Sequence, residues 1–160
     1  MKTYDKIFVL GHEENQSLFE NDDDIIEISE KVDGANFRFE IVNNKLFFAS
    51  RNQPLVEGQI NKNFRRAVEY VTSKFESLPI EKRSEFEGKV FFCENMIKHT
   101  IGYNWDITPP AIGYDVFDVV NGKYVENAKE VFDRLGIEFV PVVWKGKVKD
   151  LHIFLESCKK

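Results

Sequence analysis

The sequence predicts an α+β domain that is rich in antiparallel sheet, and three patterns support this fold class. Apolar and polar residues alternate over 35–41, which is the period of an amphipathic strand. Asn43-Asn44 follows and suits a tight turn, because asparagine tolerates positive φ, so the chain is expected to return as a strand over 45–50. Apolar residues then recur at intervals of three and four over 60–78, which predicts an amphipathic helix.

The remaining elements are shorter. Apolar runs predict strands at 6–10, 25–30, 89–94, 112–120 and 137–144. Asn127 with Glu130 resembles a capping box that begins a helix, and Gly136 would end that helix. A last amphipathic segment covers 150–158. Two stretches are expected to lack regular structure, an acidic solvated turn over 20–24 and a loop over 51–58.

The composition is that of one globular domain. The chain has 160 residues, of which 42% are hydrophobic and 31% charged, and this excludes a largely disordered protein. The net charge of −5 provides no global basic field, so any site for nucleic acid must be a local patch. No apolar run is long enough to span a membrane, and no cleavable signal pattern is present. Cys93 and Cys158 are far apart, which favours reduced thiols in a cytoplasmic protein, and the three histidines form no metal signature.

The run Glu-Lys-Val-Asp-Gly-Ala-Asn at 30–36 carries the clearest chemistry. It places a lysine at the end of one strand and an Asp-Gly turn before the next. If the backbone is extended there, Lys31 and Asp33 point to the same side. A lysine amine attacks a phosphoryl group only when neutral, and its ordinary pKa of about 10.4 must be lowered by desolvation or positive charge. Asp33 acts in the opposite direction, so a metal or further cations would be required. The alternative is a plain β-turn beside a solvated lysine.

This run resembles motif I of the covalent nucleotidyltransferases, which comprise DNA ligases, RNA ligases and mRNA capping enzymes. It is most similar to the ATP-dependent RNA ligases of the T4 RNA ligase 2 type, which favour Glu-Lys-x-(His/Asp)-Gly-x-Asn. The opening residues 4–7, Tyr-Asp-Lys-Ile, also resemble the first strand of those domains. Asp33 is shared with DNA ligases and capping enzymes, whereas Asn36 favours an RNA ligase, in which its counterpart engages the RNA end.

Three further runs match the family in its own order. Arg51, in Ser-Arg-Asn, resembles the arginine of motif Ia, which contacts phosphate through its planar fork of donors. Glu94, at the end of the apolar run Val-Phe-Phe-Cys, resembles the motif III glutamate, which binds the ribose. Phe117, in Tyr-Asp-Val-Phe-Asp-Val, resembles the motif IIIa phenylalanine, which stacks on adenine. Taken singly, these residues also read as a surface arginine, an edge-strand charge and a core phenylalanine.

The resemblance implies an antiparallel-sheet-rich nucleotidyltransferase fold of the ATP-grasp-like ligase adenylation type, with 1–160 forming the N-terminal part of a single adenylation domain. It implies ATP and Mg²⁺ as cofactors and RNA with 5′-phosphate and 3′-hydroxyl ends as partner. Lys31 would form a lysyl-AMP intermediate, with Asp33 as the second catalytic residue. The implied nucleotide-binding residues are Glu30, Lys31, Arg51, Glu94 and Phe117. Asn36 and Arg51 would bind the RNA end.

The sequence departs from the family at its C-terminal end. The Glu-Gly of motif IV and the Lys-x-Lys strand of motif V are absent. Residues 145–149, Lys-Gly-Lys-Val-Lys, come too early for motif V and predict a basic hairpin or turn. We therefore expect a domain that is incomplete at its C-terminus, and a naturally shortened homologue is the alternative.

Several functions stay open from the sequence alone. A DNA ligase or a GTP-dependent capping-type nucleotidyltransferase would share these motifs. A non-catalytic ligase homologue would bind nucleotide or RNA without chemistry. An unrelated α+β domain with chance matches is the third alternative. Lys62, Arg65 and Arg66 read as the solvated face of a helix, with a nucleic-acid backbone as their alternative partner.

Overall fold

The computed structural model describes residues 1–10, 12–15, 17–97 and 103–159. The chain divides into two compact units. Unit 1 consists of Met1–Thr3 and Val32–Val140, and unit 2 consists of Tyr4–Lys31 and Pro141–Lys160. Unit 1 combines helices with a six-stranded sheet, and unit 2 contains a two-stranded sheet. All strand pairs are antiparallel, which confirms the expected fold class.

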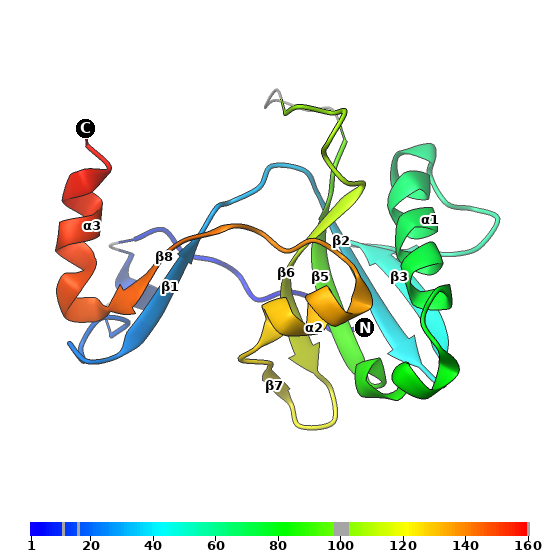
Figure 1. The fold of residues 1–160 in the computed structure, drawn as a ribbon, viewed down its shortest axis with the longest axis horizontal. Helices are drawn as coiled ribbons and strands as arrows, with labels where there is room; N and C mark the ends of the chain where they lie inside the picture. Colours follow the sequence, from blue (N-terminus) through cyan, green and yellow to red (C-terminus); the bar gives the residue numbers. More distant parts are fainter. Residues whose placement is uncertain (11, 16, 98–102, 160) are drawn as a thin grey trace. The chain divides into compact units, whose positions relative to one another are not determined.

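The sheet of unit 1 has the strand order β4-β3-β2-β5-β6-β7, with β2 and β5 at its centre (Figure 1). Its strands are β2 (Ala35–Val42), β3 (Lys45–Ser50), β4 (Pro54–Leu55), β5 (Lys89–Asn95), β6 (Ala111–Asp118) and β7 (Lys123–Tyr124). Asn43 and Asn44 have φ angles of 53° and 63°, so the predicted turn between β2 and β3 is confirmed. The Glu87 carboxylate accepts hydrogen bonds from both of their backbone amides and holds this turn.

Two helices in unit 1 follow the predicted patterns. Helix α1 (Lys62–Glu76) buries the stripe Ala67, Val71 and Phe75, and the Asn61 side chain caps its first turn by accepting from the Asn63 amide at 2.9 Å. Helix α2 (Ala128–Leu135) ends at Gly136, whose φ of 85° is the expected left-handed cap. The predicted capping box is wrong, because the Asn127 side chain makes no capping hydrogen bond. Short 3₁₀ helices also occur at Glu13–Asn15, Ile80–Lys82, Ser84–Phe86 and Val148–Asp150.

A phenylalanine core fills the space between the sheet and these two helices. Phe39 on β2 stacks on Phe91 of β5, with ring centroids 4.8 Å apart, and Phe132 of α2 meets the Phe91 ring edge-on at 5.4 Å. These side chains are buried together with the apolar stripe of α1. Because successive side chains of a strand point to opposite faces, the residues between them on β2 and β5 face the other side of the sheet. The core therefore determines which side chains form that second face.

Unit 2 pairs β1 (Ile25–Ser29) with β8 (Val142–Lys147) and adds the helix α3 (Leu151–Ser157). The basic turn predicted over 145–149 is confirmed only in part, since Lys145 to Lys147 lie in β8, whereas Val148 and Lys149 lie in the 3₁₀ helix that leads into α3. Gly146 leaves room for the Trp144 ring of the same strand, because a Cβ at this position would lie 2.6 Å from that ring. The basic side chains pair with acidic residues of the same unit: Lys145 with Glu27 of β1 at 3.1 Å, and Lys147 with Asp23 of the acidic turn at 3.6 Å. The acidic residues at 20–24 form the predicted exposed turn.

Two predicted strands differ from the structure. Residues 6–10 form no strand, and Ile7 and Val9 are 73% and 74% exposed, so the apolar run has found no strand partner among the described residues. The strand predicted over 137–144 is divided at Pro141, which has no amide hydrogen for a ladder. Before it, Phe139 forms a single parallel bridge with Gly113, and β8 begins after it.

Two global features complete the description. Within the described ranges, no helix combines the length and the apolar character needed to span a bilayer. Cys93 is buried in the core of unit 1 and Cys158 is exposed in unit 2, and both are free thiols. Burial raises the pKa of the Cys93 thiol well above its ordinary value, so this side chain behaves as a small apolar residue.

The contact between α2 and β6 gives a test of the core. A Cβ added at Gly113 would lie 2.5 Å from Cζ of Phe132, so Gly113→Ala should lower the free energy of unfolding by about 1–3 kcal/mol through overpacking. Chemical denaturation would measure the loss. In a Phe132→Leu background the same substitution should cost much less, because the obstructing ring is gone. An equal loss in both backgrounds would contradict this packing.

Candidate functional site

The motif I segment begins in unit 2 and ends in unit 1. The backbone amide of Glu30 donates to the Pro141 carbonyl at 2.9 Å, which fixes the chain at the end of the β1–β8 pair. Val32 is buried in unit 1 against Met96 and Val140. Lys31 lies between these two anchors, with an exposed side chain. Its backbone is therefore held on both sides, while its amine is open to solvent.

The Asp-Gly pair allows the chain to pass very close to β5. A Cβ at Gly34 would lie 2.5 Å from the Asn95 carbonyl oxygen, so only glycine fits without a shift. Gly34 is outside the positive-φ region, which means that space, and not the turn expected from the sequence, requires the glycine. The Gly34 amide donates to the Glu94 carboxylate at 3.0 Å, and the Asp33 amide donates to the Tyr103 hydroxyl at 2.8 Å. Motif I is thus connected directly to the motif III glutamate.

Asn36, Glu94 and Tyr114 form a polar group on the second face of the sheet. Asn36 and Glu94 are Cα partners across β2 and β5, and the Asn36 amide group donates to the Tyr114 hydroxyl at 3.3 Å. Burial and the nearby Glu94 charge strongly raise the pKa of Tyr114, so its phenol is neutral at physiological pH. Sequence reasoning did not select Tyr114 as a site residue. A register shift between Phe92 and Cys93 brings it to this face, and no residue pattern indicates that shift.

Arg51 lies at the same end of the sheet as Asn36 and Glu94. The β2–β3 register pairs Phe37 with Ser50, the last residue of β3, and Arg51 follows it in the turn beyond the strand. A hydrogen bond of 2.8 Å from the Ser50 amide to the Gln53 carbonyl closes the turn that carries Arg51. The Arg51 side chain is exposed. The Arg51 guanidinium is therefore accessible to a ligand at this end of the sheet.

Phe117 lies on the same face but further along the sheet. Its Cα partner is Val90, four β5 positions from Glu94, which is roughly 13 Å at about 3.3 Å per residue. Tyr124 meets its ring edge-on at 5.1 Å, and the Lys2 ammonium lies 5.2 Å from the ring centroid. A base that stacked on the face covered by Lys2 would have to displace that cation, a contact worth about 0.5–1 kcal/mol at exposed sites.

The structure therefore places three of the predicted residues of unit 1, Asn36, Glu94 and Phe117, on one face of one sheet. Asp33 precedes β2 and Arg51 follows β3, so both lie in the segments next to the end of the sheet that carries Asn36 and Glu94. Glu30 and Lys31 belong to unit 2. Divalent metal ions that accompany nucleotides are commonly held by one or two carboxylates together with substrate phosphates. The described residues contain no cluster of three His, Cys, Asp or Glu side chains that could hold a metal ion.

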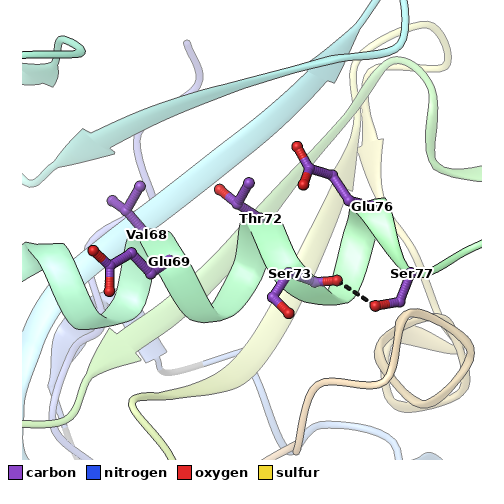
Figure 2. Close-up of a pocket in the computed structure, with 6 residues that line it drawn as sticks. All are labelled: Val68, Glu69, Thr72, Ser73, Glu76 and Ser77. Carbon is purple, nitrogen blue, oxygen red and sulfur yellow. Dashed lines mark hydrogen bonds between the residues drawn. The ribbon is translucent and has the colours of Figure 1, made fainter.

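A hollow of about 410 Å³ on the outer surface of α1 carries none of these residues. Figure 2 shows that its lining comes from one helix, with the carboxylates of Glu69 and Glu76 near its ends and the Ser77 hydroxyl bonded to the Ser73 carbonyl. Two carboxylates disfavour a phosphate ligand. The second face of the sheet remains the better candidate for a nucleotide.

Comparisons with known proteins bear on the family and the fold of this chain. A family model of RNA ligases matches residues 24–158. A ligand-free mutant of the Naegleria gruberi RNA ligase superposes with a TM-score of 0.68 and 14% identity over 92% of this chain and 44% of its own. A mutant of that ligase with ATP and Mn gives 0.68 and 13% over 92% and 44%. Its complex with PPi gives 0.59 and 15% over 82% and 40%. No curated protein sequence matches.

The superpositions and the family model establish different properties of this chain. At identities of 13–15%, the superpositions show the fold of an RNA ligase nucleotidyltransferase. The chain spans less than half the length of the ligases that it matches, 44% in the superposition with the ligand-free mutant. The family model covers most of this sequence, from the start of the β1 segment to the end of α3. The chain belongs to the RNA ligase family.

Proposed function

We propose that this chain is the N-terminal part of an ATP-dependent RNA ligase adenylation domain of the T4 RNA ligase 2 type, with both units belonging to that domain. The observation that carries the proposal is the hydrogen bond from Gly34 of motif I to Glu94 of motif III, beside Asn36 on the same sheet face. It joins residues that the sequence assigned separately to one nucleotide site. The match of 24–158 to RNA ligases favours RNA as the polymer.

The proposed reaction has three steps. The Lys31 amine loses a proton and attacks the α-phosphate of ATP, so that a phosphorus–nitrogen bond forms and pyrophosphate leaves. The AMP then passes to the 5′-phosphate of an RNA, which frees the lysine. Finally a 3′-hydroxyl attacks that activated phosphate, and AMP leaves as the phosphodiester forms. Mg²⁺ would neutralise phosphate charge in these steps.

The residues of unit 1 would hold the substrates. Glu94 would accept hydrogen bonds from the ribose and would still accept the one from the Gly34 amide, since a carboxylate has about four acceptor positions. Phe117 would stack on the adenine, Arg51 would bind a phosphate, and Asn36 would engage the RNA end. Asp33 would orient Lys31 or a metal-bound water.

The nucleophile gives the most direct test of this function. Incubation of the chain with ATP and Mg²⁺ should add the mass of one AMP, and Lys31→Ala should abolish the adduct. Lys145→Ala is the matched control, because it removes another exposed lysine of unit 2. An adduct that persists in Lys31→Ala would contradict the assigned nucleophile. An unmodified wild-type chain would favour the non-catalytic homologue, and stronger labelling with GTP would favour a capping-type enzyme.

Glu94 has two roles that two substitutions separate. Glu94→Gln keeps an acceptor oxygen for the Gly34 amide but removes the charge, and Glu94→Ala removes both. A hydrogen bond to a charged group is worth about 1.5–3 kcal/mol against about 1 kcal/mol for a neutral one, so Glu94→Gln should raise the KM for ATP roughly tenfold. Only Glu94→Ala should lower the free energy of unfolding markedly, by about 1–3 kcal/mol. An unchanged KM in Glu94→Gln would make the residue purely structural.

Stacking on Phe117 is tested with another phenylalanine of the same sheet. Base stacking on an aromatic ring is worth about 1–3 kcal/mol, so Phe117→Leu should raise the KM for ATP by roughly 5- to 150-fold. Phe47→Leu is the matched control, since Phe47 is a half-exposed ring on β3. Equal KM values for the two variants would show that adenine does not stack on Phe117.

A further inference from the structure

Arg38 is a buried arginine on the second face of the unit 1 sheet. Its Cα partners are Ala49 on β3 and Phe92 on β5, and only 7% of its surface is exposed. Within the part of the chain that the structure describes, its guanidinium forms no ion pair and its Nε has no hydrogen-bond partner. A positive charge is therefore buried here without a negative partner among those residues.

Such a charge is costly, because the desolvation penalty of a buried ion is about several kcal/mol. Burial lowers the pKa of the Arg38 guanidinium, yet an arginine keeps its proton in proteins. An apolar side chain between Ala49 and Phe92 would avoid the penalty. An arginine at this position thus indicates a role beyond packing.

The contacts of Arg38 show what that role is. Its Nη1 donates to the Ser50 carbonyl at 2.8 Å and to the Arg51 carbonyl at 3.1 Å. The same turn is closed by the Ser50 amide and hydroxyl, which donate to the Gln53 carbonyl at 2.8 and 3.2 Å. Arg38 therefore holds the carbonyls of two consecutive peptides, Ser50–Arg51 and Arg51–Asn52, which lie on either side of the Arg51 Cα. The exposed Arg51 side chain projects from this fixed turn and forms no ion pair among the described residues.

We propose that Arg38 is a positioning residue that fixes the turn at Ser50–Gln53, so that the Arg51 guanidinium is held ready for a terminal phosphate. The inference rests on the proposed phosphate-binding role of Arg51 and deepens it. The ligand class is a phosphate monoester or polyphosphate, supplied either by the 5′ end of an RNA or by ATP. The buried charge of Arg38 adds to the positive potential beneath that phosphate. Because the turn is already fixed before the phosphate binds, less conformational entropy is lost on binding.

The test compares ligands with and without the phosphate. Dissociation constants of the chain are measured for a 5′-phosphorylated RNA oligonucleotide and its 5′-hydroxyl form, and for ATP and adenosine. Arg38→Gln should reduce the preference for the phosphorylated ligand roughly tenfold in one of these two ligand pairs. The pair that loses its preference identifies the source of the phosphate, RNA or ATP. Arg134→Gln removes an exposed arginine of α2 and should leave the preference unchanged.

A double-mutant cycle shows whether Arg38 acts through Arg51. The double variant Arg38→Gln/Arg51→Gln should lose no more preference than Arg51→Gln alone, because the held group is already absent. Losses that multiply, or a preference that Arg38→Gln leaves intact, would overturn the proposal. If Arg38→Gln does not fold, Arg38→Lys keeps the charge and loses the planar fork, and it should still lower the preference. If the chain is labelled with AMP but Arg38→Gln leaves the phosphate preference unaltered, only the positioning role of Arg38 is refuted. If the chain is not labelled but Arg38→Gln alters the phosphate preference, only the proposed catalysis is refuted.

Discussion

The side-chain alternation of β2 is the constraint on which the rest of unit 1 depends. Phe37 and Phe39 enter the core. Asn36, which precedes Phe37, and Arg38, which lies between the two rings, must therefore face the opposite side of the sheet. A register slip of one residue would place two polar groups in the core and expose two aromatic rings. The stacking of Phe39 on Phe91 fixes the same register for β5, and with it the position of Glu94 beside Asn36. Core packing thus determines the composition of the candidate site.

A second constraint acts where the chain enters β2. Gly34 approaches the β5 backbone so closely that a side chain is excluded, and its amide is satisfied by Glu94. The same carboxylate serves the fold and, in our proposal, the ribose. Lys31 comes three residues before Gly34 and belongs to unit 2. The motif I run therefore crosses from unit 2 into unit 1, and in our proposal it carries the nucleophile Lys31.

Periodicity was sufficient to predict β2 and α1, while the Asn43-Asn44 turn predicted β3 and Gly136 predicted the end of α2. Periodicity failed where a distant partner strand or a local backbone hydrogen bond determines whether a strand forms. The apolar run at 6–10 lacks a described partner strand, and Pro141 divides the expected strand before β8. Of the site, the roles assigned from family motifs stay predictions, although the structure pairs Asn36 with Glu94. Tyr114 lies inside the motif IIIa run but was given no role, and Arg38 was not selected. A β-bulge and a pair of backbone carbonyls, respectively, give these two residues their surroundings, and neither leaves a residue pattern.

The central claim is that nucleotide binds on the polar face of the β2–β5–β6 sheet. Its most direct test is the titration of ¹⁵N-labelled chain with ATP, followed through backbone amide shifts. We expect the largest changes at Gly34, Asn36, Glu94 and Phe117, together with the turn that carries Arg51. Shifts confined to the outer surface of α1, around Glu69 and Glu76, would contradict this account, as would an unperturbed spectrum at saturating ATP.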